Sequence, residues 1–172
     1  MSPSSISISK LRADVDGRVI APEDDEYDQA RALFYGGMDR HPAAIVRVKD
    51  DMDVVRVVAL ARESGLELAV RSGGHSIPGH SVSEGGIVID LADMRALEID
   101  VEARTAWAQT GLTALGFTTA AAEHGLGVGF GDTGSVGIGG ITLGGGVGYL
   151  VRKYGLTIDD LLAADIVTAD GE

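Results

Sequence analysis

A segment of 24 residues, Gly125 to Gly148, constrains this chain more than any other stretch, because 12 of its residues are glycine. Apolar residues such as Val128, Phe130 and Ile141 separate the glycines. A flexible linker would instead carry serine, proline and charged residues. Glycines between apolar anchors indicate a backbone that turns sharply and comes close to another group. A ligand with phosphates suits such a backbone, because exposed N–H groups in glycine loops form anion-binding nests.

The composition is that of an ordinary globular protein with a strongly acidic balance. The chain has 172 residues, enough for one sizeable core or two small lobes. Its net charge of −12 disfavours a nucleic-acid partner and an anionic membrane surface. A dinucleotide is still compatible with this charge, because it needs only local N–H groups and one or two cations.

Several absences narrow the possibilities further. The chain has no cysteine, which excludes disulfides and thiolate metal sites, and no carboxylate stands at metal spacing beside His75 and His80. No apolar run approaches the roughly 20 residues that a membrane span needs. The first residues lack the basic start and apolar core of a signal peptide. We therefore expect a cytoplasmic protein without a metal site or a membrane partner.

The first clear elements follow one another as strand, helix, strand and glycine turn, which is typical of a βαβ unit. The expected strands are 43–48 and 66–70, and between them lies a helix capped by Asp50 or Asp51 and stopped at Gly65. Upstream, we expect a loose stretch over residues 1–10, a turn at 14–17 and a weak helix over 23–35. Downstream, we expect strands at 87–91, 96–100, 105–109 and 164–168, a helix at 112–124 and a short turn or helix at 159–163.

The last four residues, Ala169 to Glu172, carry a hairpin-turn signal with no second strand after it. This pattern predicts that the chain is a fragment of a longer protein, or one piece of a nicked one.

The turn after the second strand, Val70 to Ser76, is the other candidate for ligand contact. Its two glycines allow close backbone approach, Arg71 offers a fork of donors to a phosphate, and Ser72 and Ser76 add hydroxyls. His75 is then held near whatever the turn grips. A tight strand-to-loop turn with a surface histidine explains the same residues equally well.

A literal G-x-G-x-x-G match occurs at Gly129 to Gly134, but the dinucleotide fingerprint needs a strand before it and a helix after it. Here a helix is expected before it and more glycine follows, so the match is interpreted as accidental. No P-loop motif is present. The glycine segment could also serve only to join two lobes. Ligand contact is favoured over that role because Gly144 to Gly146 offer three successive backbone groups without side chains.

Taken together, these motifs resemble the FAD-binding domain of the p-cresol methylhydroxylase and vanillyl-alcohol oxidase superfamily. Within it they are most similar to the berberine bridge enzyme-like and 6-hydroxynicotine oxidase-like flavoproteins. The resemblance runs from about Pro42 to the end of the chain. It is carried by the stretches 42–46, 70–76, 85–91, 136–140, 144–148 and 152–160.

The resemblance implies an α+β fold with two FAD-binding subdomains and FAD between them. The expected divisions are an N-terminal segment 1–41, a first subdomain 42–100 and a second, incomplete subdomain 101–172. The cofactor-binding residues that the resemblance implies are Arg71, Ser72, Gly73, Gly74, His75, Ser76, Thr133, Val136, Gly137, Gly139, Gly140, Gly144, Gly145, Gly146, Gly148, Tyr149 and Val167.

Four of these positions carry specific expectations. His75 matches the family histidine that bonds covalently to the 8α-methyl carbon of the flavin. Some relatives add a second bond through a cysteine where this chain has Thr133, so a single bond is expected here. Val136 stands where these enzymes tune oxygen access, and a small valine favours an oxidase. Val167 falls near the stretch that borders the adenine.

In this family a separate substrate domain follows, and a last segment that returns to the flavin domain supplies the catalytic base, so no catalytic residue is assigned in this chain. The expected function is the FAD-binding portion of an oxidase that passes a hydride from a small organic substrate to flavin N5 and electrons to O₂. This portion alone is expected to be inactive, with the rest of its own polypeptide as partner. The alternatives are a non-catalytic FAD-binding or interaction module and a Rossmann-type nicotinamide dehydrogenase.

Overall fold

The structure is a computed structural model that describes residues 6–172, and these fold into two compact units. Unit 1 contains the chain up to Arg71, then His75–Asp93 and Ile166–Glu172, while unit 2 contains Ser72–Gly74 and Met94–Asp165. The expected cofactor-binding subdomains, divided at 41/42 and 100/101, stay a prediction beside these two compact units. The described part of the N-terminal segment belongs to unit 1 because its strand pairs with the first strand of the expected βαβ unit.

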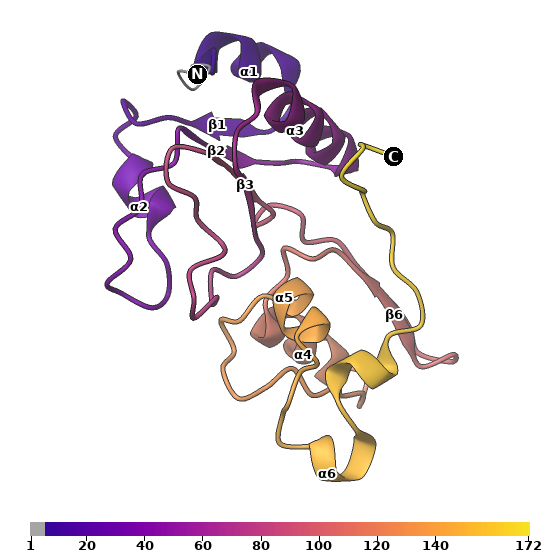
Figure 1. Ribbon diagram of the computed structural model, residues 1–172. Helices are drawn as coiled ribbons and strands as arrows, with labels where there is room; N and C mark the ends of the chain where they lie inside the picture. Colours follow the sequence, from indigo (N-terminus) through magenta and orange to yellow (C-terminus); the bar gives the residue numbers. More distant parts are fainter. Residues whose placement is uncertain (1–5) are drawn as a thin grey trace. The chain divides into compact units, whose positions relative to one another are not determined.

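Unit 1 is built on a four-stranded sheet with strand order β1-β2-β4-β3. Strands β1, β2 and β3 of this sheet are labelled in Figure 1. Strand β1 runs antiparallel to β2, whereas β2, β4 and β3 run parallel to one another. The central strand β4 is buried along its whole length, which fits its unbroken Ile-Val-Ile run. The bounds of the strands are β1 Arg18–Ile20, β2 Ala44–Arg47, β3 Leu68–Arg71 and β4 Ile87–Asp90.

Helix α3, Asp51–Ser64, joins β2 to β3 and confirms the predicted helix with both of its end signals. The Asp50 side chain caps it by accepting a hydrogen bond from the Asp53 N–H at 3.0 Å. Gly65 ends the helix in the left-handed region, with φ of 64°. The buried face of α3 is formed by Asp53, Val57 and Ala61, so an aspartate occupies the first position of an otherwise apolar stripe.

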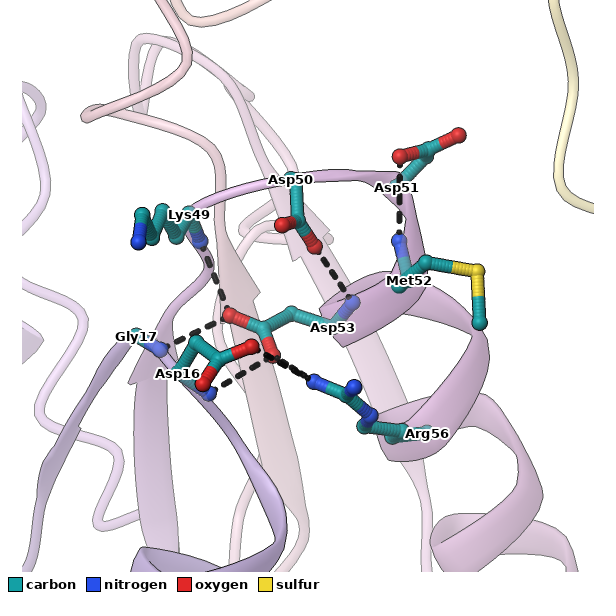
Figure 2. Close-up of polar contacts among 8 residues, drawn as sticks. All are labelled: Asp16, Gly17, Lys49, Asp50, Asp51, Met52, Asp53 and Arg56. Carbon is teal, nitrogen blue, oxygen red and sulfur yellow. Dashed lines mark hydrogen bonds and ion pairs between the residues drawn. The ribbon is translucent and has the colours of Figure 1, made fainter.

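The buried Asp53 carboxylate organises the N-terminal end of α3 (Figure 2). It accepts hydrogen bonds from the backbone N–H groups of Asp16, Gly17 and Lys49 at 2.8 to 3.1 Å. The Arg56 guanidinium lies 2.9 Å away on the same carboxylate. The turn predicted at 14–17 is therefore fixed to the helix by a side chain that the sequence suggests only as a favourable first-turn charge. Burial of the Asp53 carboxylate raises its pKa, but the hydrogen bonds from these donors lower it by more. The net result is a pKa below the ordinary value.

A second charged cluster closes the carboxyl ends of the three parallel strands. Arg47, Arg71 and Asp90 are the last residues of β2, β3 and β4, and the strand register sets both arginines opposite the aspartate. Asp90 Oδ2 lies 2.8 Å from Arg71 Nη2 and 3.2 Å from Arg47 Nε. The Arg71 and Asp90 side chains are almost completely buried, so this pair holds the strand ends together away from water.

Two short helices complete unit 1. Helix α1, Ile8–Asp14, is capped by Ser7, so the looseness expected over residues 1–10 is wrong for Ile8 onward, and residues 1–5 lie outside the described part. Helix α2, Tyr27–Arg31, is shorter than the weak helix predicted over 23–35. A main core cluster of unit 1 consists of Ile20, Tyr27, Ala30, Ile45, Ala69, Val82 and Val88.

Unit 2 combines a β-hairpin with short helices around a small core. The predicted pair of strands is confirmed as an antiparallel hairpin, and the helix predicted over 112–124 is confirmed with narrower bounds. The core is formed by Leu112, Ala114, Phe130 and Ile138. The bounds of the elements are β5 Leu97–Asp100, β6 Thr105–Ala108, α4 Ala114–Ala122, α5 Ile138–Leu143, α6 Val151–Tyr154 and the 3₁₀ helix η1 Thr157–Asp160.

The strand predicted over 164–168 is wrong. These residues are not paired with any other strand in the described part of the chain, and Ile166 is 73% exposed. The turn predicted over 169–172 is present, because the Thr168 N–H donates to the Glu172 carbonyl oxygen and the Gly171 N–H donates to the Thr168 carbonyl oxygen, both at 2.9 Å. Within residues 6–172, no helix is both long and apolar enough to cross a membrane.

Replacing the buried carboxylate, Asp53→Asn, should lower the free energy of unfolding at pH 7 by about 1–3 kcal/mol, because an amide cannot satisfy all the donors that converge there. The lowered pKa of Asp53 stabilises the folded state above the ordinary aspartate pKa of about 3.9, and this contribution is lost as pH falls through the folded-state value. The variant should lack this part of the acid-induced loss. Urea unfolding at pH 7 and at acid pH measures both effects.

The matched control is Asp51→Asn, an exposed carboxylate in the same helical turn, which accepts a hydrogen bond from the Met52 N–H. Its unfolding midpoint should stay close to that of the wild type. Equal midpoints for wild type and Asp53→Asn would contradict the role given to Asp53.

The change Asp90→Asn should destabilise unit 1 more strongly, by about 3–5 kcal/mol, because it leaves the buried Arg71 guanidinium without a counter-charge. Removing both charges in Arg71→Met/Asp90→Leu should recover much of that loss. The exposed neighbour Asp93→Asn serves as the control. Thermal unfolding of the four proteins measures the effect, and a loss below about 1 kcal/mol for Asp90→Asn would mean that the pair behaves like a solvated one.

Candidate functional site

The predicted site begins where β3 ends. The Arg71 carbonyl oxygen still accepts a hydrogen bond from the Leu91 N–H at 2.9 Å, so the pairing of β3 with β4 continues as far as Arg71. The next three residues, Ser72–Gly74, belong to unit 2, and His75 belongs again to unit 1. Gly74 has a φ of 71°, in the left-handed region that favours glycine. The turn therefore contributes residues to both units.

Within unit 2, the middle of this turn lies directly against the glycine segment. A side-chain carbon on Gly73 would lie 2.2 Å from the Gly137 nitrogen, and one on Gly137 would lie 2.3 Å from the Gly73 nitrogen. No side chain fits at either position, because real carbon contacts of this kind essentially never come below 3.0 Å. The two stretches that the sequence singles out separately are thus in backbone contact.

Thr110 supports the same junction, although nothing in its sequence context distinguishes it. The Ser72 hydroxyl donates to the Thr110 carbonyl oxygen, and a side-chain carbon on Gly139 would lie 3.0 Å from the Thr110 Cβ. An isolated β-bridge pairs Thr113 with Gly137. These contacts fix the chain that enters α5 against the turn.

The later glycines serve two different purposes. Gly146 lies against Thr157, and Gly148 lies against Gly131, so their small size allows the segment to fold closely onto itself. Both Gly145 and Gly146 have positive φ angles, of 99° and 74°. Gly140 is different, because a side-chain carbon there would meet no atom within 4 Å. Packing within the segment therefore explains Gly146 and Gly148, whereas Gly140 presents open backbone.

Apolar side chains next to these glycines are exposed. Leu143 is 77% exposed, Val147 68% and Tyr149 85%. Val136 is half-buried against the core of unit 2, and Thr133 is exposed with its hydroxyl bonded to Asp132. Large apolar groups at such exposure are typical of a surface that contacts another group.

Unit 1 holds the remaining predicted residues. Arg71 Nη2 is paired with Asp90, whereas Arg71 Nη1 is buried and has no hydrogen-bond partner among the described residues. Of the two terminal guanidinium nitrogens predicted to face a phosphate, one is therefore already bonded within the protein. Ser76 Oγ accepts from the His80 N–H at 3.0 Å, and Val167 is half-buried. Sequence reasoning missed Asp90 and Arg47, although their positions at the ends of predicted strands were available as a signal.

His75 is half-buried and lies against aromatic rings from the loop before β2. Its ring is stacked on Phe34, with centroids 3.9 Å apart and planes inclined by 19°. Tyr35 meets the imidazole edge-on at 6.1 Å. Burial lowers the pKa of His75 below its ordinary value, which favours the neutral imidazole at neutral pH.

The literal G-x-G-x-x-G match does not have the surroundings of a dinucleotide fingerprint. Helix α4 precedes it, and within the described chain no strand leads into Gly129. The Rossmann alternative considered from the sequence therefore lacks its structural context.

Comparison with known proteins agrees with this geometry. The family described as "FAD binding domain" matches residues 42–172. The (R)-6-hydroxynicotine oxidase of Paenarthrobacter nicotinovorans is 38% identical over 158 residues, which cover 92% of this chain and 34% of the relative. The solved structure of BBE-like 1 from Physcomitrella patens has a TM-score of 0.92 at 28% identity, covering 97% of this chain and 37% of that one.

A third similar structure is the grass pollen allergen Phl p 4, with a TM-score of 0.86 at 27% identity over 94% of this chain and 36% of that one. That allergen has glucose dehydrogenase activity, and an isoleucine-to-valine variant of it is a glucose oxidase. The chain spans about a third of the length of the curated relatives it matches. Its fold is the mixed α+β fold of these flavoproteins. The chain therefore belongs to the FAD binding domain family, together with 6-hydroxynicotine oxidase and the berberine bridge enzyme-like FAD-linked oxidoreductases.

Proposed function

We propose that this chain is the FAD-binding portion of a flavin-dependent oxidase. The observation that carries the proposal is the backbone contact between Gly73 and Gly137, which joins the turn after β3 to the glycine segment. Both stretches are rich in glycine, and backbone without side chains is what close approach to a pyrophosphate requires. Family membership supports FAD as the ligand.

The residues present fit such a cofactor. Arg71 Nη1 is a buried cationic donor without a partner among the described residues, which suits an anionic oxygen. Gly140 presents open backbone for close approach. The exposed side chains of Leu143, Val147 and Tyr149 suit an apolar ring system. In this proposal the turn residues Ser72 to Ser76 hold the phosphates, and the part of the glycine segment from Thr133 onward borders the ring.

His75 is the proposed covalent attachment point, as its match to the family histidine implies. An imidazole attacks carbon only in its neutral form, and burial lowers the pKa of His75 in that direction. The chain has no cysteine, so a second, thioether attachment is not available.

When bound, FAD supplies the redox chemistry by accepting a hydride at N5 and passing two electrons to O₂. The part of this chain is to bind the cofactor, orient it and limit access to it. Val136 is the residue we assign to oxygen access. Its small side chain favours an oxidase, as the family resemblance implies. In the similar Phl p 4 allergen, an isoleucine-to-valine variant is a glucose oxidase, which shows that one valine can matter in such a fold. We assign the substrate to the class of small organic molecules, and no catalytic base to these residues.

A non-catalytic FAD-binding module is the second candidate, since the chain covers only about a third of its relatives. Bound flavin that no substrate reduces would favour this module over the oxidase.

The first test is acid precipitation of the purified protein. Yellow colour should remain with the wild-type pellet and move to the supernatant in His75→Ala, because the variant binds FAD without the bond. The control is His80→Ala, an exposed histidine of the following loop, which should behave as the wild type does. A colourless protein that takes up no added FAD would contradict the proposal.

The second test uses Gly140→Ala, which adds one carbon where the protein itself leaves room. The fold should be unchanged or stabilised by about 0.5–1 kcal/mol, because alanine favours a helix over glycine. FAD affinity should fall by about tenfold or more, since the added carbon occupies backbone that the cofactor approaches. Gly127→Ala is the matched control, because it is equally open. Flavin fluorescence titration measures affinity. Equal affinity of the wild type, Gly140→Ala and Gly127→Ala would contradict a cofactor that approaches α5.

A further inference from the structure

We propose that Phe34 is a positioning residue that holds the His75 imidazole in the orientation needed for covalent flavin attachment. This inference rests on the proposed function of His75 and extends it to a residue outside the turn and the glycine segment. Nothing in the sequence pattern distinguishes Phe34, which stands in an irregular stretch between α2 and β2.

The geometry is that of a face-to-face stack. Ring centroids of Phe34 and His75 are 3.9 Å apart, and their planes differ by only 19°. Tyr35 meets Phe34 at 90° and 5.1 Å, and so supports the stack from the side. Phe34 is 56% exposed, which is unusual for a phenylalanine whose only purpose is core packing. We therefore attribute the position of this exposed ring to its contact with His75.

The stretch that carries Phe34, residues 32–43, is fixed at several points and we call it the aromatic loop. At its start, Arg31 is paired with Asp39 and donates to the Arg40 carbonyl oxygen at 3.3 Å. Arg40 in turn donates to the carbonyl oxygens of Gly79 and Val82, at 3.1 and 2.9 Å. These two acceptors lie in the stretch that follows His75, so the aromatic loop and the His75 region are bound to each other.

The end of the aromatic loop is held in the same way. The His41 N–H donates to Glu84 at 2.9 Å, and the His41 carbonyl oxygen accepts from the Gly85 N–H at 2.9 Å. The Tyr27 hydroxyl donates to the Pro42 carbonyl oxygen at 2.7 Å inside the core. An anchored loop thus holds Phe34 against His75. A chance contact between two exposed rings would not need a loop fixed at so many points.

The Phe34 ring contacts the face of the imidazole and not its edge, where the nitrogens lie. The nitrogen lone pair lies in the ring plane, so Phe34 restricts rotation of the ring without covering the nitrogens. A nucleophile held in a near-attack orientation reacts faster than one that rotates freely. Burial also lowers the pKa of His75, which keeps the imidazole neutral.

The bond that Phe34 assists joins an imidazole nitrogen to the 8α-methyl carbon of the flavin. The imidazole N–H and one methyl C–H bond are broken. Their two hydrogens and two electrons pass finally to O₂, the acceptor of the proposed function, as hydrogen peroxide. The net change is one new C–N bond on His75 and one molecule of peroxide for each cofactor attached.

The test is the rate of covalent attachment after FAD is added to the cofactor-free full chain, followed by flavin fluorescence in denaturing gels. Phe34→Leu should slow attachment by about three- to tenfold, in line with the usual strength of aromatic pairs. Total flavin bound should stay within about twofold. Phe34→Tyr keeps the ring and should restore the rate. Trp107→Leu removes an aromatic ring of similar exposure on β6 and should leave the rate unchanged.

A second readout is independent of the cofactor. In the cofactor-free protein, the ring current of Phe34 should shift the His75 Hε1 resonance, and this shift should be lost in Phe34→Leu and kept in Phe34→Tyr. An unchanged attachment rate in a folded Phe34→Leu variant with bound flavin would overturn this inference alone. A wild-type chain that binds flavin but never attaches it would overturn both the inference and the role of His75, while FAD binding would stand.

Discussion

The contact between the Gly73 and Gly137 backbones is the constraint on which the proposed cofactor site depends. These residues are far apart in the sequence, and a side chain on either one would overlap the main chain of the other. Because both are glycine, the turn after β3 and the entrance to α5 come together main chain to main chain. The bond from Ser72 to Thr110 and the bridge from Thr113 to Gly137 hold the same junction. Within unit 2, the glycines therefore allow a close backbone junction that no other residue type would permit.

An acidic protein that binds an anionic cofactor needs a local charge opposite to its overall one. The chain has a net charge of −12, yet at the carboxyl ends of its three parallel strands two arginines meet a single aspartate. Ligands of open parallel sheets bind beyond this edge. Salt screens exposed charges beyond about 8–10 Å, so the local excess of one cation outweighs distant surface carboxylates. Asp90 also keeps Arg71 in place, which makes the cation part of the sheet and not a mobile surface group.

The sequence predicts those parts of the fold whose signals are local. Helix α3 has a capping aspartate and a terminal glycine, and the hairpin β5–β6 has alternating residues, so both were predicted correctly. The family motifs also identified the flavoprotein fold. Features that depend on contacts across the chain were not predicted. The strand at 164–168 failed because pairing needs a partner strand, which no propensity of the segment itself can provide.

The candidate site was likewise predictable only where its signals are local in the sequence. Glycine spacing pointed to the turn and to the glycine segment, but not to the atoms that meet there. In the sequence, Asp53 looks like a charge at a helix end. In the structure it is a buried hydrogen-bond acceptor, and its position was not predictable because its partners come from a turn well upstream. Phe34 reads as one aromatic residue in a loop, and its ring lies on His75 only because Arg31 and Arg40 fix that loop. Such side chains become visible only when the fold brings separate segments together.

In the proposed site, the framework and the stack would act on different steps of covalent attachment. Before the proposed bond forms, only noncovalent contacts would retain FAD, so the open backbone around Gly140 and the cation of Arg71 would determine how long it stays. Whether the bond forms in that time would depend on how much of His75 is neutral, which burial favours, and on how well it is oriented, which is the role we propose for Phe34. A well-oriented histidine needs only a short residence time. A chain with few cationic contacts can therefore still become fully loaded, because orientation at position 75 compensates for modest affinity at the phosphates.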